Sequence, residues 1–431
     1  MDQLIEFLSF SDINVRYVVL GSVLLAVSSA IVGSFTFLKK KALVGDAVAH
    51  SVLPGVCLAF IFSGVKNPLI LILGAFITGW LSLVLIDLIV AKSKIKEDTA
   101  IGLILSVFFG LGILLLTAIQ HSGNAAQSGL DHFLFGKAAA LVGKDLWTFS
   151  AIAVILIFSV ILFYKEFTLL AFDQHFAKSI GFPVRTLELV LTTLTVLAVV
   201  TGIQAIGVVL MAAMLITPAA AAKFWTDKLR VMILLAAGIA GFSGLVGAYI
   251  SYVAPSMPTG PWIVMVLSLI AVFSFFFAPE KGIIYKALNK RKFQKQMLEE
   301  NILKLFFQLG EKNEKQFYRS WSTNDIIANR PFRLNRLLFG LKNLKTQGYM
   351  QKEGEQWRVT EAGKVKGQRL TKLHRLWELY LTEYLRIAPD HVHEDAETIE
   401  HIITPELEAR LEKLLKYPKL DPHQSEIPYS N

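Results

Sequence analysis

Two patterns of apolar and polar positions divide the chain. From about residue 10 to residue 280, apolar runs of about 20 residues recur, and each is long enough to cross a bilayer as a helix. The remaining residues mix apolar and polar positions as a water-soluble domain does. The pattern predicts about nine membrane spans followed by a soluble part. The predicted spans are 17–38, 47–63, 67–91, 100–119, 146–164, 187–204, 206–224, 231–253 and 260–278.

The soluble part has the pattern of a winged helix followed by more helix. Helical periodicity covers residues 299–310 and 331–347, with a further helix capped by Ser322 or Thr323 between them. Residues 348–360 favour two short strands around a turn, and a long helix follows to about residue 385. Three helices and a hairpin are typical of a winged helix-turn-helix.

The expected fold is therefore an all-α polytopic membrane domain, a winged helix-turn-helix and a small α-helical domain. A basic stretch after the last span is expected to anchor to anionic lipid. The predicted boundaries are 1–280 for the membrane domain, 281–298 for the basic juxtamembrane linker, 299–370 for the winged helix and 371–431 for the helical domain.

Lysine and arginine follow the odd-numbered spans far more often than the even-numbered ones. Lys39, Lys40 and Lys41 follow the first span, for example. Since positively charged loops stay in the cytoplasm, this alternation predicts an N-terminus outside and a cytoplasmic C-terminal domain. The same rule explains much of the net charge of +9, so the charge alone does not indicate nucleic acid.

A carboxylate and an imidazole lie inside the second apolar run. Asp46 and His50 are four residues apart, so on a helix they share one face. Ionisable groups within a span are costly and indicate function, and this pair suits a divalent transition metal. The alternative is a buried structural ion pair or a capping network.

Three segments resemble the permease subunit of the bacterial ATP-driven zinc, manganese and iron importers, the ABC-3 family. They are KKKALVGDAVAHSVLPG, AFDQHFAKSIGFPVR and GVVLMAAMLITPAAAA, and together they place the resemblance over about residues 10–280. The resemblance implies a homodimer in the cytoplasmic membrane, two cytoplasmic ATPase subunits and an extracellular delivery protein. It places Asp46 and His50 on the metal pathway. The chain has no phosphate-binding loop, so we expect no catalytic residue and no bound nucleotide.

Residues 165–185 form an amphipathic segment between two spans. Periodicity alone predicts a helix that lies on the membrane surface or docks into a partner. The resemblance implies that residues 171–182 are the coupling helix that docks on the ATPase. The residues expected in this contact are Phe172, Asp173, Phe176 and Gly181.

Glutamate and histidine gather again near the C-terminus. Residues 300–428 resemble the iron- and manganese-dependent repressors of the diphtheria-toxin-repressor type, most closely in LHRLWELYL and VHEDAETIEHIITPELEARLEKLL. The resemblance implies a primary metal site and an ancillary one, with Glu300 as a further ligand from the first helix. The primary set is His374, Glu397, Glu400 and His401, and the ancillary set is Glu378 and His393. Glu397 stands where iron-responsive members have cysteine, which favours manganese, with zinc and iron as alternatives.

The soluble part admits three functions. The favoured one is a cytosolic metal sensor that regulates transport. The second is a membrane-tethered DNA-binding regulator, in which Arg330, Arg333 and Arg336 would meet phosphates, although these side chains could equally be a solvated face. The third is a scaffold with a purely structural metal.

Overall fold

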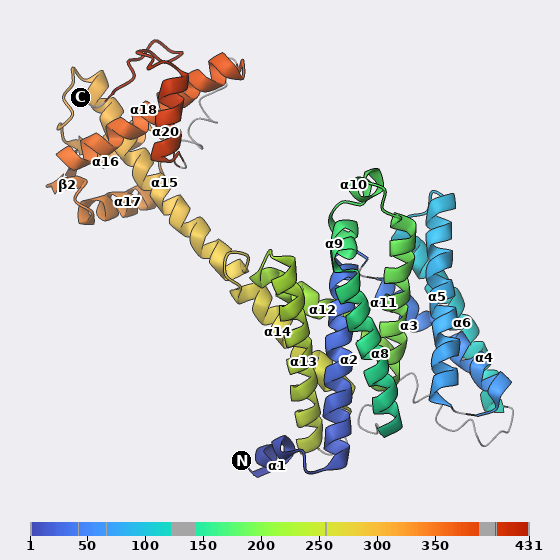
Figure 1. Ribbon diagram of the computed structural model, residues 1–431. Coiled ribbons are helices and arrows are strands. Elements are labelled where there is room, and N and C mark those ends of the chain that lie inside the picture. The colour runs from blue at the N-terminus through green and yellow to red at the C-terminus, as the bar shows by residue number, and fades with distance from the viewer. Residues whose placement is uncertain are drawn as a thin grey trace. The chain divides into compact units, whose positions relative to one another are not determined.

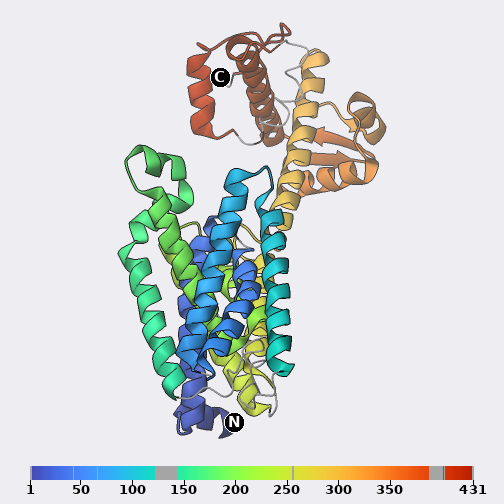
Figure 2. The ribbon, with the colours of Figure 1, turned by 90° about the vertical axis from the view of Figure 1, so that its right-hand side faces the viewer.

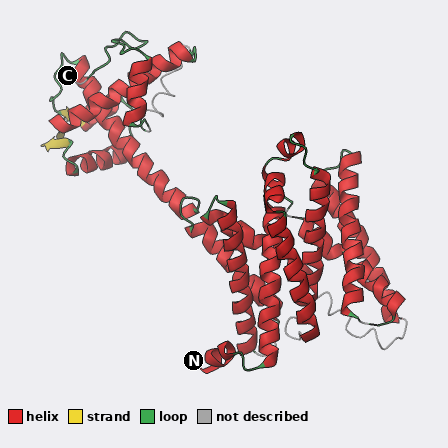
Figure 3. Ribbon diagram, in the orientation of Figure 1, coloured by secondary structure: helices red, strands yellow, loops and turns green. Residues whose placement is uncertain are grey.

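The computed structural model describes residues 2–41, 43–65, 67–121, 143–254, 257–387, 401 and 403–429. The chain divides into two compact units, Met1–Tyr285 and Lys286–Asn431. Helices make up most of the described structure, and the described strands lie in the second unit (Figure 3). This agrees with the predicted fold class.

The first unit is a bundle of long helices that run roughly alongside one another (Figure 1 and Figure 2). Eight described segments are long and apolar enough to span a membrane, and Leu210–Trp225 is a shorter apolar helix. These nine segments correspond to the nine predicted spans. The helices are α1 (Asp2–Ser9), α2 (Ile13–Leu38), α3 (Val44–Ser51), α4 (Leu53–Ser63), α5 (Pro68–Lys92), α6 (Glu97–His121), α8 (Gly143–Leu162), α9 (Tyr164–Phe172), α10 (Gln174–Ser179), α11 (Val184–Ile206), α12 (Val208–Trp225), α13 (Leu229–Val253) and α14 (Thr259–Phe277).

The second predicted span is two helices, α3 and α4, that meet at Val52. Pro54 lies in the first turn of α4 and has no N–H to donate to the carbonyl of His50, four residues earlier. The helix that carries Asp46 and His50 is therefore only eight residues long. Its orientation can differ from that of the span that follows it.

Helix α3 lies inside the main apolar core of the bundle. It packs against α5, α6, α11 and α12. Ala47, Val48 and Ala49 are fully buried, and a Cβ added to Gly45 would lie 3.4 Å from the Cα of Ala212 on α12. Small residues allow this close approach between helices within a membrane. The packing holds α3 in place from several sides.

The second unit has the winged-helix arrangement that the pattern predicted. One helix covers both the predicted linker and the first soluble helix, because α15 runs without interruption from Ile283 to Lys312. A short strand that the sequence did not indicate, β1, completes an antiparallel sheet of order β1-β3-β2. The elements are β1 (Trp321–Ser322), α16 (Thr323–Asn329), α17 (Leu334–Thr346), β2 (Met350–Glu353), β3 (Gln356–Val359), α18 (Glu361–Tyr384) and α20 (Pro405–Leu414).

The predicted cap of α16 is Ser322, which forms a capping box. The Asp325 amide donates to the Ser322 hydroxyl at 3.2 Å, and the Ser322 amide donates to the Asp325 carboxylate at 3.0 Å. The hydrogen bonds from Ser322 lower the pKa of Asp325. Ile302, Phe306 and Leu341 belong to the core that packs α15 and α17 against the sheet.

Candidate functional site

Asp46 and His50 lie one turn apart on α3, and both side chains are half-buried. Neither makes an ion pair or a side-chain hydrogen bond with a residue that the structure describes, and the His50 Nδ1 is buried without a partner there. The His50 ring meets the edge of Phe109 from α6, with 5.3 Å between ring centroids. A structural ion pair between Asp46 and His50 is thus not what the described residues show. An acidic side chain and a buried imidazole nitrogen without a described partner are groups that a passing metal ion can use.

Three lysines form the turn between α2 and α3. The Lys39 Nζ lies 2.6 Å from the Glu188 Oε1 of α11, whereas the Lys41 Nζ lies 3.4 Å from the Asp87 Oδ1 of α5. The turn borders a pocket of about 880 Å³ whose walls include residues of α5 and of α11. The sequence indicated these lysines as topology signals and as the start of one segment that carries the family resemblance. The sequence did not indicate a contact for Glu188, because its partner, Lys39, is 149 positions away in the chain.

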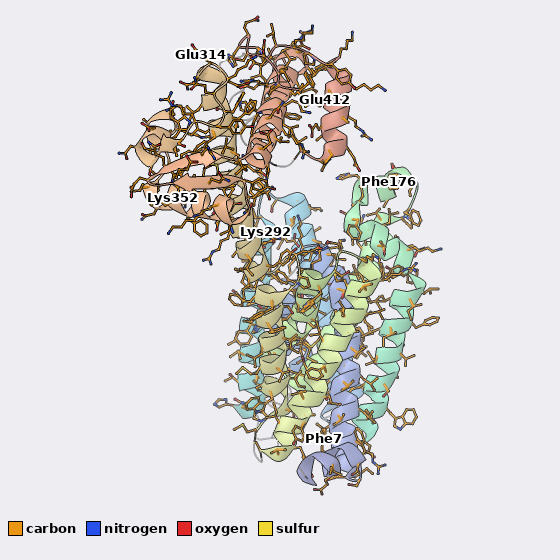
Figure 4. The ribbon with its side chains drawn as sticks, turned by 90° about the vertical axis from the view of Figure 1, so that its left-hand side faces the viewer. Phe7, Phe176, Lys292, Glu314, Lys352 and Glu412 are labelled. Carbon is orange, nitrogen blue, oxygen red and sulfur yellow. The ribbon has the colours of Figure 1, made fainter. Side chains whose placement is uncertain are left out.

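The amphipathic segment 165–185 forms two short helices, α9 and α10, and α10 lies within residues 171–182, the part predicted to dock on an ATPase. Asp173 separates them and caps α10, since its carboxylate accepts a hydrogen bond from the Phe176 amide at 2.8 Å. Phe172 and Phe176 are 64% and 53% exposed, and Gly181 has a φ of +89° that favours glycine. Phe176 lies at the opposite end of the bundle from Phe7 (Figure 4). The two large exposed apolar side chains suit a protein contact.

In the second unit the predicted metal ligands that the structure describes form two pairs. The His374 Nε2 lies 3.1 Å from the Glu378 Oε1 within α18, and the His401 Nδ1 lies 2.6 Å from the Glu300 Oε2 of α15. All four residues are buried. Glu397, Glu400 and His393 lie outside the described residues. Within the described ranges, no group of three or more such side chains could hold a metal, so the predicted sets stay predictions.

Buried carboxylates need a cation or hydrogen-bond donors to offset their lost hydration. Glu300 has a histidine and Gln296, which donates at 2.9 Å. Glu378 borders a pocket of about 990 Å³, and the His423 Nε2 of the C-terminal tail is 4.0 Å from its Oε1. The prediction missed His423, because a single tail histidine gives no periodic signal. These donors are of the type that divalent transition metals prefer.

Ion pairs tie α20 to α18 beside these histidines. The Lys372 Nζ lies 2.6 Å from the Glu408 Oε1 and 2.7 Å from the Glu412 Oε1. Burial alone would raise the pKa of Glu408, but the hydrogen bonds and charges of Lys372 and Arg369 outweigh it and lower that pKa. For Lys372, burial alone would lower the pKa, and the two carboxylates raise it instead. The links hold α20 in place after the segment that carries His401.

The arginines that could meet DNA lie at the start of the third helix of the winged helix. Arg333 is the residue before α17, Arg336 is in its first turn, and both are exposed. Arg330 is half-buried, with its guanidinium 5.7 Å from the Phe332 ring centroid. The arrangement is compatible with phosphate contacts.

Comparisons with known proteins match both units. The family model described as "ABC 3 transport family" matches residues 11–278. The model described as "Iron dependent repressor, metal binding and dimerisation domain" matches residues 360–429. Both resemblances drawn from the sequence are confirmed.

Three relatives give the scale of the similarity. The manganese transport system membrane protein MntC of Bacillus subtilis is 42% identical over 87% of this chain and 86% of its own length. The zinc transport system membrane protein TroC of Treponema pallidum is 43% identical over 66% of this chain and 95% of its own. The solved structure of PsaBC from Streptococcus pneumoniae in complex with Fab has a chain that is 32% identical, with a TM-score of 0.58, and the match covers 64% of this chain and 97% of that one.

Proposed function

The chain belongs to the ABC 3 transport family and is a metal-transport permease with a repressor-type domain fused behind it, and from this premise we propose that its cargo is manganese, with zinc and iron as the alternatives. The observation that carries the proposal is the pair Asp46 and His50. They lie on a short helix inside the apolar core and make no ion pair with a described residue. Two ligands bind an ion weakly enough for release, which a transport pathway requires. The name of the relative from Bacillus subtilis supports manganese.

The driving subunits are separate chains in this proposal. A cytoplasmic ATPase docks on α9 and α10 through Phe172 and Phe176, which are large, apolar and exposed. An extracytoplasmic protein delivers the ion to the opposite side, and two copies of the permease form the pathway as a homodimer. The N-terminus is outside, and the second unit is in the cytoplasm. The membrane is the bacterial cytoplasmic membrane.

Uptake into vesicles tests the cargo. We expect vesicles that contain the full chain, its ATPase and its delivery protein to accumulate radioactive manganese only when ATP is supplied to the ATPase. Labelled manganese should accumulate faster than labelled zinc or labelled ferrous iron at equal concentration, because geometry and ligand type, and not affinity alone, select among these ions. Faster accumulation of labelled zinc would reassign the cargo. No ATP-dependent accumulation of any of the three ions would overturn the proposed function.

The fused domain is a cytosolic metal sensor in this proposal. His374, Glu378, His401 and Glu300 provide nitrogen and oxygen donors, and Glu397, Glu400 and His393 would complete the sites. Glu300 belongs to α15, which begins at Ile283, close to the last span. A metal bound by Glu300 and His401 would favour one arrangement of α15 over another and so change the transport rate.

Replacing Glu300 with glutamine tests the sensor. We expect manganese on the side of the second unit to inhibit the ATPase of the reconstituted complex, and Glu300→Gln to raise the concentration for half inhibition by about tenfold or more. Glu299→Gln is the matched control, because Glu299 is equally buried on the same helix but binds Gln347. A response that is unchanged in Glu300→Gln would contradict sensing at this site.

The runner-up function, a membrane-tethered DNA-binding regulator, is favoured by one observation. Arg333 and Arg336 are exposed at the start of α17 in a winged helix. In that case the full chain in lipid discs would shift a specific operator fragment in the presence of manganese, and Arg333→Ala would remove the shift. The sensor function predicts that Arg333→Ala leaves the ATPase response intact.

A further inference from the structure

The turn between α2 and α3, residues 39–43, leads directly into the helix that carries Asp46 and His50. Its lysines pair with two helices of the bundle that pack against each other, α11 and α5. Lys39 pairs with Glu188 on α11, and Lys41 pairs with Asp87 at the end of α5. Positive-inside topology explains why lysines occur here. It does not explain why two of them have specific partners.

The Lys39 pair is connected to the ATPase-docking segment. The Glu188 Oε1 that binds the Lys39 Nζ at 2.6 Å also accepts a hydrogen bond from the side-chain amide of Gln174. Gln174 is the first residue of α10. One carboxylate oxygen thus joins α10, α11 and the end of α2. The Lys39 side chain is 10% exposed and the Glu188 side chain 36%, so the pair is shielded from water on the lysine side.

Apolar contacts fix α9, the helix before α10, to α2 and α11. The rings of Phe35 on α2 and Phe167 on α9 have centroids 5.6 Å apart, and both residues are fully buried. One core cluster includes these rings together with Leu187 and Leu191 of α11. Such a cluster moves as a unit, because close-packed side chains transmit displacement rather than absorb it. A displacement of α9 therefore reaches α2 through this cluster, and a displacement of α10 reaches it through Gln174, Glu188 and Lys39.

The contacts on the other side of the turn are looser. The Lys41 Nζ lies 3.4 Å from Asp87 and 3.9 Å from Glu97, and all three side chains are at least 30% exposed. Exposed pairs of this kind contribute little and exchange easily with water. Lys40, between the two paired lysines, is exposed, has a φ of +60° and makes no ion pair with a described residue. The turn is thus held firmly on the α11 side and weakly on the α5 side.

We infer that Lys39 and Glu188 are positioning residues that transmit ATPase-driven movement of α9 and α10 to the helix holding Asp46 and His50. The inference rests on the proposed function and names the link within it. When the ATPase displaces α10, Glu188 carries Lys39 with it, and the turn moves the start of α3. The Lys41 contacts, which are longer and more exposed than the Lys39 pair, resist this movement little.

The test is the number of metal ions transported per ATP hydrolysed by the full complex in vesicles. Lys39→Met keeps the length of the side chain and removes its charge. We expect it to lower this ratio by about fivefold or more, the range of ordinary allosteric coupling, while ATPase binding and ATP hydrolysis continue. Glu188→Gln should have the same effect. The exchange Lys39→Glu with Glu188→Lys should restore at least part of the ratio.

Lys40→Met is the matched control, because it removes the same charge from the same turn without removing an ion pair. Equal ratios for Lys39→Met, Lys40→Met and the unchanged chain would overturn the inference, and so would equal losses in both variants. If Lys39→Met fails to assemble, the double variant Lys39→Glu with Glu188→Lys is the deciding test. A double variant that recovers none of the ratio of metal ions to ATP would contradict the inference. Asp46→Ala tests the proposed function separately, because it removes the metal ligand and leaves Lys39 and Glu188 in place.

Discussion

Replacing Asp46 with alanine is expected to reduce ATP-driven manganese uptake by about 100-fold or more. Asp46 supplies the carboxylate on α3, and His50, one turn away, supplies the only other ligand that we assign to the pathway. An ion that crosses the apolar core loses much of its hydration and needs such groups to replace it. The measurement is the initial rate of radioactive manganese uptake by vesicles that contain the complete transporter.

The outcome separates a pathway ligand from a structural residue. Asp46→Asn keeps the size of the side chain and removes its charge, so we expect a loss almost as large. The ATPase should still bind and hydrolyse ATP in both variants, because α9 and α10 are unaffected. His121→Ala is a control histidine variant that should leave uptake unchanged, because His121 lies at the end of α6 and bonds only the Thr117 carbonyl among described residues. If the Asp46→Ala variant takes up manganese at nearly the rate of the unchanged chain, the assignment of Asp46 as a ligand on the pathway is wrong.

The position of Asp46 and His50 on one helical face could be predicted because it follows from a spacing of four residues. The break between α3 and α4 could not, since residues 47–63 form one apolar run and Pro54 is tolerated in a continuing membrane helix when neighbours satisfy the freed groups. The spacing of apolar residues also could not predict which helices pack around α3. It depends on four helices that are distant in sequence.

Pairs that join distant segments account for the rest of what the sequence could not show. Lys39 and Glu188 are 149 positions apart, and Glu300 and His401 are 101 apart. Helical periodicity reports which face of a helix is apolar and not which side chain meets it across the core. The family resemblance named Glu300 as a ligand, and the structure places it beside His401. The family resemblance assigned no role to Glu188 or His423.

The two clusters of histidine and acid differ in a way that suits their proposed functions. Asp46 and His50 are half-buried and make no ion pair with a described residue, as a transient site requires. Glu300 and His401 are buried and paired at 2.6 Å, and Glu378 and His374 are paired at 3.1 Å. A sensor must hold its ion long enough to shift a conformational equilibrium, which favours buried, preorganised donors. The pathway site and the sensor site therefore need different surroundings for the same ligand types.

Replacing Phe176 with aspartate is expected to prevent the permease from binding its ATPase. Phe176 is 53% exposed on α10, and Phe172 at the end of α9 is 64% exposed. A buried aromatic anchor in an interface typically contributes about 2 kcal/mol or more, which corresponds to roughly a 30-fold change in Kd. An aspartate would add the cost of burying a charge, so the loss should be larger. The measurement is the Kd for the purified ATPase on the permease in lipid discs.

Two further variants show whether the apolar anchor or the fold of α10 is responsible. Phe176→Leu should retain most of the affinity, because it keeps an apolar side chain of similar reach. Asp173→Ala removes the cap of α10 and leaves Phe176 in place, so it should weaken binding by a smaller factor through the cost of ordering the helix, about 1 kcal/mol. The Asp46→Ala variant should bind the ATPase with an unchanged Kd, because the substitution alters only the metal pathway. An unchanged Kd for Phe176→Asp would show that the ATPase docks elsewhere. The contacts of Gln174 and Lys39 with Glu188 could then not transmit ATPase movement, because the ATPase would not displace α10.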